Sequence, residues 1–297
     1  MTAQPNATDP LADFSDRIAT IVAGAAPSVV AVHGGRRPTS GFAWRPDLVV
    51  TAEEAVEADE GVDVGLPGGE RVRAELVGRD PATAVALLRL PGRELPSLAL
   101  ADAPEPRAGE LVVAVGGHDA GPIAALGVVA VTGGAWRSLR GGRIDRLLHL
   151  DLRLAGRGEG GIVLDATGQA LGMAVFGPRR RVLAIPAPTV ERVAAQLAVH
   201  GRVARGYLGL GLQPVRLDGS GEEAAMVMSV DPQGPGARAG LQQGDVIATW
   251  DGQPVGGVRK LLRELGPDSV GRTVELGLRR AGQPASASLT IGERPAG

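Results

Sequence analysis

The sequence predicts a mostly β protein built in two units, and three observations support this prediction. The chain has 297 residues, which is long for a single compact core, so two domains are expected. Between Ser28 and Phe176, short apolar segments alternate with turns rich in Gly, Pro and Asp, a pattern typical of β-barrels or sandwiches. After residue 206 the pattern changes to a few strands, a helix and a final hairpin.

The N-terminal segment is expected to be a tail that does not direct export. Residues 1–13 predict a disordered tail, and Ala12–Gly24 is compatible with a short amphipathic helix. Met1–Pro10 lacks the basic start and apolar run of a signal peptide. No stretch approaches the ~20 apolar residues of a membrane span. We therefore expect a soluble cytoplasmic protein without a membrane partner.

The long β region is expected to hold nine strands or hairpins followed by a helix. Their ranges are Ser28–His33, Gly41–Ala52, Val62–Leu66, Glu70–Gly78, Ala84–Leu90, Leu111–Gly116, Ile123–Thr132, Leu147–Leu154 and Gly161–Phe176. The helix is expected at Pro188–Val199, because Val190, Val193, Ala194 and Leu197 recur on one face.

The second unit is expected to follow a linker at residues 201–206. Its strands are predicted at Tyr207–Leu212, Ala225–Val230 and Asp245–Trp250, with a helix at Gly256–Leu265 and a hairpin made of Thr273–Arg279 and Ala285–Ile291. The two units show no internal repeat.

Composition excludes several classes of function. The net charge of -2 and the pI of about 6.1 give no electrostatic reason to expect a nucleic-acid partner. The chain has no cysteine, so disulfides and thiolate chemistry are excluded. The glycine-rich run Gly156–Gly161 formally fits a dinucleotide-binding motif, but a strand and hairpin follow it instead of a helix. We expect no cofactor and no metal.

Two segments together resemble the HtrA/Deg-type serine proteases. Gly78–Leu88, GRDPATAVALL, is similar to the stretch around the family's catalytic aspartate, and Asp231–Ile247 is similar to the core of the family's PDZ domain. Pro27–Val30 and Leu183–Pro186 extend the resemblance, which covers the chain from about Phe14 to Ile291.

The resemblance implies a fold and a domain plan. Residues 14–200 would form two six-stranded β-barrels of the chymotrypsin/trypsin-like fold. Residues 207–297 would form a PDZ domain, a small sandwich-like β fold with two helices. The family often forms trimers, so a homo-oligomer is possible from the resemblance.

The three catalytic positions of the family carry other residues in this chain. Glu54 stands where the family has histidine, after the strand that ends at Ala52. Ala84 aligns with the catalytic aspartate, and Glu159, eight residues after Asp151, replaces the nucleophilic serine. Gly158 and Glu159 would form the former oxyanion-hole loop.

These substitutions predict that the ordinary serine-protease mechanism is lost. Acyl transfer needs a hydroxyl, an imidazole that takes its proton and a carboxylate that orients the imidazole. Glu159 has no hydroxyl proton to give, Glu54 is a weaker base than imidazole, and Ala84 orients nothing. We therefore expect a catalytically inactive homologue, a pseudoprotease and not an enzyme. The alternative is an active serine-type endopeptidase or hydrolase that uses a non-standard residue set.

The histidines offer no obvious replacement for the missing base. His33, His118, His149 and His200 are spread along the chain, and no serine lies in a matching turn near any of them. Ser40 is the most suggestive serine by position, but a hydroxyl at the start of a strand is the more ordinary interpretation.

The two glutamates at the catalytic positions raise a separate possibility. If the fold is kept, Glu54 and Glu159 lie close together, and two close carboxylates cannot both ionise cheaply. They would share a proton, recruit an arginine such as Arg157, or hold a cation. The more ordinary outcome is that both side chains turn outward into solvent.

The PDZ domain is expected to carry the positive function. The resemblance places the family's carboxylate-binding loop at Tyr207, Leu208, Gly209 and Leu210, and the strand that starts near Leu210 can pair with a peptide. An apolar pocket for the terminal side chain would be lined by Leu208, Leu210, Leu212 and one of Leu261 or Leu262. The expected partners are protein C-termini or extended peptides, bound by an adaptor, scaffold or chaperone in protein quality control.

Overall fold

The computed structural model describes residues 9–57, 61–100, 105–138, 140–217 and 221–295. The chain divides into two compact units between Val203 and Ala204, and each is described by itself. This division lies inside the segment expected to be a linker. The assignment of 14–200 and 207–297 as domains stays a prediction.

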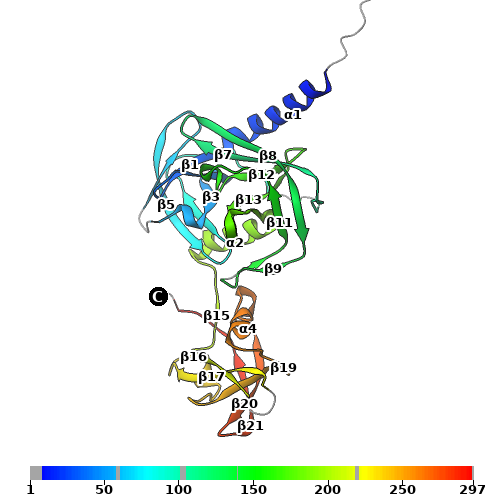
Figure 1. The fold of residues 1–297 in the computed structure, drawn as a ribbon. Coiled ribbons are helices and arrows are strands. Elements are labelled where there is room, and N and C mark those ends of the chain that lie inside the picture. Colours follow the sequence, from blue (N-terminus) through cyan, green and yellow to red (C-terminus); the bar gives the residue numbers. More distant parts are fainter. Residues whose placement is uncertain (1–8, 58–60, 101–104, 139, 218–220, 296–297) are drawn as a thin grey trace, which may run out of the picture. The chain divides into compact units, whose positions relative to one another are not determined.

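Helix α1 (Pro10–Ala25) opens the first unit (Figure 1). The Asp9 carboxylate accepts a 3.0 Å hydrogen bond from the N–H of Leu11, and Pro10 fits the first helical turn. Only Ala25 of this helix is buried. The helix begins earlier than expected, because residues 10–13 of the predicted tail are helical. Residues 1–8 of that tail lie outside the described part of the chain.

The first barrel is closed by six antiparallel strands. In their order around the barrel they are β1 (Val29–His33), β2 (Thr39–Arg45), β3 (Leu48–Ala52), β6 (Val85–Arg89), β5 (Arg71–Asp80) and β4 (Val62–Gly65). The expected segment Gly41–Ala52 is a hairpin of β2 and β3.

The second barrel is also closed by six strands. In order they are β11 (Leu147–Asp151), β14 (Val182–Pro186), β13 (Ala170–Phe176), β12 (Ile162–Asp165), β7 (Leu111–His118) and β8 (Gly121–Gly133). A separate ribbon pairs β9 (Trp136–Arg137) with β10 (Arg143–Ile144). Strand β14 was not among the expected strands, and it is needed to close the barrel.

Helix α2 (Ala187–His200) follows the barrels and packs against β5, β6, β13 and β14. Its buried face contains Val190, Val193, Ala194 and Leu197, as the spacing predicted. The helix ends at Gly201, which has a φ of 68° and donates its N–H to the carbonyl of Leu197. A residue with a side chain would be strained in this left-handed cap.

The second unit contains a sheet with strand order β16-β17-β18-β20-β21, with β19 paired to β18. The strands are β16 (Leu210–Arg216), β17 (Glu223–Val230), β18 (Val246–Trp250), β19 (Gln253–Pro254), β20 (Thr273–Arg280) and β21 (Gln283–Thr290). A short ribbon pairs β15 (Gly206–Tyr207) with β22 (Gly292–Glu293). The helices are α3 (Pro235–Arg238) and α4 (Val258–Arg263).

The predicted fold class is confirmed: the chain is mostly β, with two six-stranded barrels followed by a smaller β unit with two short helices. Short 3-10 turns, named η, connect several strands. Among the described residues, no helix is long and apolar enough to cross a membrane.

Candidate functional site

The positions of the missing histidine and aspartate lie next to each other in the first barrel. Strand β3 pairs with β6, so that Ala52 faces Val85. Glu54 lies in the turn η2 (Glu53–Ala55) after β3, and the N–H of Glu53 donates a 3.0 Å hydrogen bond to the carbonyl of Ala84. Ala84 has a φ of 60°, a strained conformation for alanine. The strand pairing that would bring the catalytic histidine and aspartate together is therefore retained, although Glu54 and Ala84 stand at the two positions.

The segment at the position of the missing serine forms backbone hydrogen bonds with both barrels, to Ser40 in β2 and to Ala174 in β13. Glu159 follows the turn η3 (Gly156–Gly158), and its carbonyl accepts a 2.8 Å hydrogen bond from the N–H of Ser40 in β2. Gly160 has a φ of 82°, and a Cβ there would lie 2.2 Å from the carbonyl oxygen of Ser40. Only glycine fits so close an approach.

The Glu159 side chain turns into the fold. Its Oε1 accepts a 3.1 Å hydrogen bond from the N–H of Phe176 at the end of β13. Burial raises the pKa of Glu159 and the charge of Glu54 raises it further, while the hydrogen bond from Phe176 and the charge of Arg180 act in the opposite direction. The charge of Glu54 thus acts on Glu159, so the two carboxylates interact electrostatically.

Glu54 and Glu159 line one cleft of about 750 Å³. Its other charged residues are Arg36, Arg37, Glu57, Arg157 and Arg180. Arg157 does not pair with the glutamates as suggested, because its guanidinium contacts Nε2 of His118. Among the described residues, no group of three or more His, Cys, Asp or Glu side chains could hold a metal ion.

One of the two N–H groups expected in the oxyanion-hole loop is already used. The N–H of Gly158 donates a 2.8 Å hydrogen bond to the carbonyl of Ala155, which closes η3. It therefore does not point freely at a substrate carbonyl. An oxyanion hole needs donors that are directed at the developing charge, and this loop lacks one of them.

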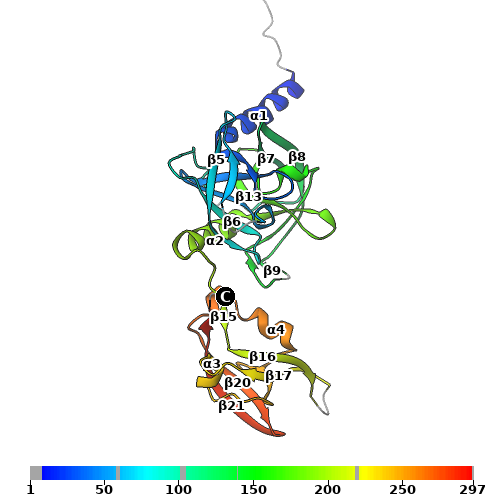
Figure 2. The ribbon, with the colours of Figure 1, turned by 90° about the vertical axis from the view of Figure 1, so that its left-hand side faces the viewer.

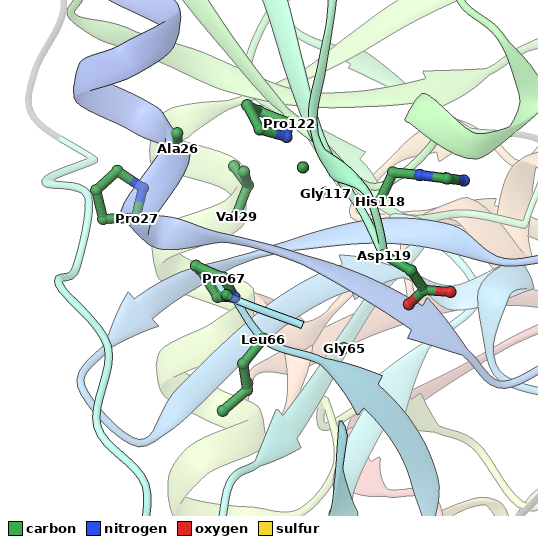
Figure 3. A pocket seen from close by; sticks show the side chains of 12 residues that line it. Ala26, Pro27, Val29, Gly65, Leu66, Pro67, Gly117, His118, Asp119 and Pro122 are labelled. Atoms are coloured by element: carbon green, nitrogen blue, oxygen red, sulfur yellow. The ribbon is translucent and has the colours of Figure 1, made fainter. Parts of the chain in front are cut away.

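Within the described residues, no histidine side chain forms a hydrogen bond with Glu54 or Glu159. His118 ends strand β7, and together with Asp119 it lines a cavity of about 270 Å³ (Figure 3). Asp119 accepts hydrogen bonds from Arg71 at 2.6 Å and shares one of 3.0 Å with Nε2 of His33. These contacts lower the pKa of Asp119. Arg71, Asp119 and His33 thus form a hydrogen-bonded cluster that contains no hydroxyl nucleophile.

The expected carboxylate-binding loop joins β15 to β16 in the second unit. Tyr207 donates a 3.0 Å hydrogen bond from its hydroxyl to Oδ2 of Asp231, and the carbonyls of Leu208 and Gly209 accept from Gly236 and Asp231. The N–H groups of Leu208 and Gly209 donate no hydrogen bond within the described part of the chain. Two neighbouring free N–H groups form a concave donor site for an anion.

Gly209 is required by the shape of this loop. Its φ is 69°, and a Cβ there would lie 2.8 Å from the Cα of Gly234. A side chain at this position would both strain the backbone and push the loop away from its neighbour.

Strand β16 lies at the edge of its sheet. Its one strand neighbour in the described sheet is β17, and Figure 2 shows α4 beside these two strands. An unpaired edge can accept a peptide as an additional strand. The free N–H groups of the loop lie at the start of this edge.

The leucines expected to line the pocket divide into two groups. Leu208 and Leu261 are only 3 % and 1 % exposed and belong to the hydrophobic core. Leu210 and Leu212 on β16 are half-buried, while Leu262 on α4 is 53 % exposed. Leu262 is thus the helix residue that remains available for a ligand.

Sequence reasoning missed the partners of Glu159. The N–H of Phe176 comes from the end of β13, the second strand of the hairpin that follows Glu159, and the guanidinium of Arg180 comes from the turn after β13. Only the register of β12 and β13, in which Ile162 faces Met173, brings them together. The arginines at 36 and 37 were visible as a basic pair, but no motif linked them to Glu159.

Comparison with known families defines the class of protein. A trypsin-like peptidase domain model matches residues 39–173 and a PDZ domain model matches residues 206–291. A probable periplasmic serine endoprotease, DegP-like, from Brucella suis biovar 1 (strain 1330) is 32 % identical over 281 residues, which are 88 % of this chain and 54 % of the relative. A DegP-like protein with the same description from Halomonas elongata is 32 % identical over 272 residues, covering 86 % of this chain and 56 % of the relative.

The chain thus contains a trypsin-like peptidase domain and a PDZ domain and is homologous to the DegP/HtrA proteases. It spans about half the length of the curated relatives it matches. Solved structures have the same fold. A serine endoprotease from Yersinia pestis has a TM-score of 0.71 at 27 % identity, covering 94 % of this chain and 98 % of that one. The HtrA-type protease AlgW with a decapeptide has a TM-score of 0.72 at 24 % identity, covering 94 % and 99 %.

The comparisons contradict two expectations. The prediction that the chain is not an enzyme is contradicted by its relatives, which are named serine endoproteases. It was drawn from three residue positions, and these exclude only the mechanism that uses them. The prediction of a cytoplasmic protein is also contradicted, since the same relatives are named periplasmic. That prediction relied on the absence of an export signal, which is weak ground for assigning a compartment.

Proposed function

We propose that the PDZ unit binds the free C-termini of protein chains or extended peptides. The observation that carries the proposal is the pair of free N–H groups at Leu208 and Gly209, located where the open edge of β16 begins. A peptide would add as a strand beside β16, and its terminal carboxylate would accept from the two N–H groups.

The side chains near this edge suit an apolar terminal residue. Leu210, Leu212 and Leu262 offer apolar surface that is partly open to solvent. A single site of this size gives an affinity on the order of micromolar. Such binding is suited to an adaptor, scaffold or chaperone that samples many chains in protein quality control, and the names of the relatives make the periplasm the compartment we propose.

Matched peptides test this proposal. A fluorescent peptide that ends in an apolar residue with a free carboxylate is compared, by anisotropy with the full chain, with the same peptide amidated at its C-terminus. We expect the amide to bind at least about tenfold more weakly, because it removes a charge-assisted hydrogen-bond acceptor. Equal affinities would refute carboxylate recognition.

A second candidate function is endopeptidase activity in the cleft of the barrel unit. It is favoured by the raised pKa of Glu159 beside Glu54, because two carboxylates that share one proton can activate water. The ionised carboxylate would take a proton from water as the water oxygen attacks the peptide carbonyl. The protonated carboxylate would give its proton to the departing nitrogen as the C–N bond breaks. No serine or histidine is needed.

Casein turnover tests this second function. Activity by this route is expected to fall at least about a hundredfold in both Glu54→Gln and Glu159→Gln, and to be insensitive to a serine-reactive fluorophosphonate. Turnover that survives both substitutions, or that the fluorophosphonate abolishes, would exclude the carboxylate pair.

A further inference from the structure

We infer that the cleft beside Glu159 binds an acidic peptide segment, whose carboxylates are held by Arg36, Arg37 and Arg180. All three arginines line the cleft. Within the described residues, none of them forms an ion pair with an acidic side chain at salt-bridge distance. Three guanidinium groups without such partners in one concave site are an arrangement suited to an anionic ligand.

The loop that carries Arg36 and Arg37 is anchored at both ends. On one side, the N–H of Glu57 donates a 2.9 Å hydrogen bond to the carbonyl of Gly34. On the other, the N–H of Ser40 donates one of 2.8 Å to the carbonyl of Glu159. The loop is therefore short and fixed between two barrel strands, which limits the entropy lost when the arginines engage a ligand.

Arg180 is held in place at the expense of backbone strain. Arg179 and Arg180 have φ values of 58° and 57°, an unfavourable conformation for residues other than glycine. The guanidinium of Arg180 lies over the ring of Phe176, 4.5 Å from its centroid. Strained residues persist where contacts with the surrounding structure hold them, and they are concentrated at functional sites. Here the strained turn places the guanidinium of Arg180 at the cleft.

The site already holds one carboxylate. Glu159 accepts the N–H of Phe176 directly beside Arg180. Thr39 also lines the cleft, and its buried hydroxyl oxygen has no hydrogen-bond partner within the described part of the chain.

The charges select a peptide over other anions. The cleft contains four arginines and three glutamates, a formal balance of 4 − 3 = +1. The glutamates would repel the concentrated charge of a polyphosphate. Carboxylates spaced along an extended peptide can instead each pair with a separate arginine. The cleft volume of about 750 Å³ is in the range of sites that bind small-molecule ligands.

This inference goes beyond capture of C-termini by the PDZ unit and does not depend on it. If the cleft also hydrolyses peptides, the inference names the substrate class of that activity. Binding is measured with peptides whose C-termini are amidated, so that the PDZ unit has no terminal carboxylate to recognise. A negative result would therefore concern the cleft alone, and not C-terminal recognition or turnover.

The test uses the full chain, two fluorescent ligands and one unlabelled competitor. The ligands are a short amidated peptide of alternating serine and glutamate and the same peptide with glutamine for glutamate. The competitor, added to the acidic peptide, is citrate. We expect the acidic peptide to bind at least about tenfold more tightly than the glutamine peptide and to weaken with added salt. Equal affinity of the two peptides would overturn the inference, and so would citrate that competes as tightly as unlabelled acidic peptide.

Two variants locate the site. Arg36→Gln/Arg37→Gln is expected to weaken acidic-peptide binding at least about fivefold, while Arg17→Gln, an exposed arginine on α1, leaves it unchanged. Arg180→Gly removes the guanidinium but relieves the left-handed strain, so it is expected to bind more weakly while melting at a temperature equal to or above that of the parent. Unchanged binding in both cleft variants would overturn the inference.

Discussion

The N–H of Phe176 donates a 3.1 Å hydrogen bond to Oε1 of Glu159. This bond ties the residue at the position of the family's nucleophile to the end of a strand that borders the cleft. It shows that Glu159 does not turn outward into solvent. The position is therefore occupied by a carboxylate that the fold partly buries and hydrogen-bonds, and its ionisation affects both stability and binding.

Glu159→Gln is expected to raise stability at neutral pH. The folded-state pKa of Glu159 lies above its ordinary value, chiefly because of burial. The native state therefore binds the proton more tightly than the unfolded state does, and stability declines as the pH rises from the ordinary pKa of glutamate through the folded pKa. Glutamine keeps the acceptor and does not titrate. Urea denaturation should show the variant above the parent near neutral pH, with the two converging below about pH 4.

A control isolates the two causes of this shift. Glu54→Gln removes only the charge of Glu54, which raises the pKa of Glu159 less than burial does. It should therefore stabilise the protein near neutral pH by less than Glu159→Gln does. The same stability for the parent and Glu159→Gln at every pH would contradict this account.

Gly209→Ala is expected to destabilise the PDZ unit and to abolish peptide capture. The substitution places a Cβ 2.8 Å from the Cα of Gly234 at a φ of 69°, so it combines a clash with backbone strain of about 1–3 kcal/mol. Gly240→Ala is the matched control, since its φ is 73° but no atom lies within 4 Å of the added Cβ. Urea melts should show the larger loss for Gly209→Ala, and equal losses would show that the clash is absent.

Arg280→Gln is expected to lower the free energy of unfolding below that of the parent, because it leaves the Asp245 carboxylate without its charge partner. Arg280 donates two hydrogen bonds of 2.8 Å to Asp245, whose side chain is 1 % exposed. The neighbouring exposed Arg279 provides the control, and Arg279→Gln should change stability by less than about 0.5 kcal/mol.

The same ion pair predicts a pH dependence in the acid range. Hydrogen bonds from Arg280 lower the pKa of Asp245 below its ordinary 3.8. Its contribution to stability is therefore present above pH 3.8 and is lost as the pH falls through the folded pKa. The acid-induced loss should be smaller in Arg280→Gln than in the parent, and equal losses would argue against the pair.

Leu261→Ala and Leu262→Ala should separate packing from binding. Leu261 is 1 % exposed and lies in the core, so its truncation is expected to cost about 2–5 kcal/mol. Leu262 is 53 % exposed, so its truncation should leave stability nearly unchanged while weakening the C-terminal peptide. Denaturation and anisotropy on both variants check this, and peptide affinity unchanged in Leu262→Ala would remove that residue from the proposed pocket.

Much of the fold was predictable because local signals agreed with it. The face of α2 at Val190, Val193, Ala194 and Leu197 followed from its spacing, and turn residues marked most strand ends. Strand β14 (Val182–Pro186) was not predicted as a strand, since it is short, follows three arginines and ends in proline. Its pairing with β11 and β13, rather than local propensity, makes it a strand.

The sites were predictable only in part. Positions Glu54, Ala84 and Glu159 could be found by alignment to a motif, whereas the contact from Glu159 to Phe176 depends on the register between β12 and β13. Burial also could not be read from leucine spacing in the PDZ unit, because Leu261 and Leu262 are neighbours with opposite exposure. The lack of activity was inferred from three substituted positions and the compartment from a missing export signal, and on both points the relatives contradict the inference.

Peptide capture by the PDZ unit requires that the N–H groups of Leu208 and Gly209, which have no partner in the described residues, receive a peptide carboxylate. Backbone amide NMR of the full chain, titrated with a free-acid peptide and with its amidated counterpart, measures this directly. We expect the Leu208 and Gly209 amide signals to move downfield with the free acid only, followed by signals along β16. If the two peptides shift these amides equally, or if neither shifts them while the free acid still binds, the account is contradicted.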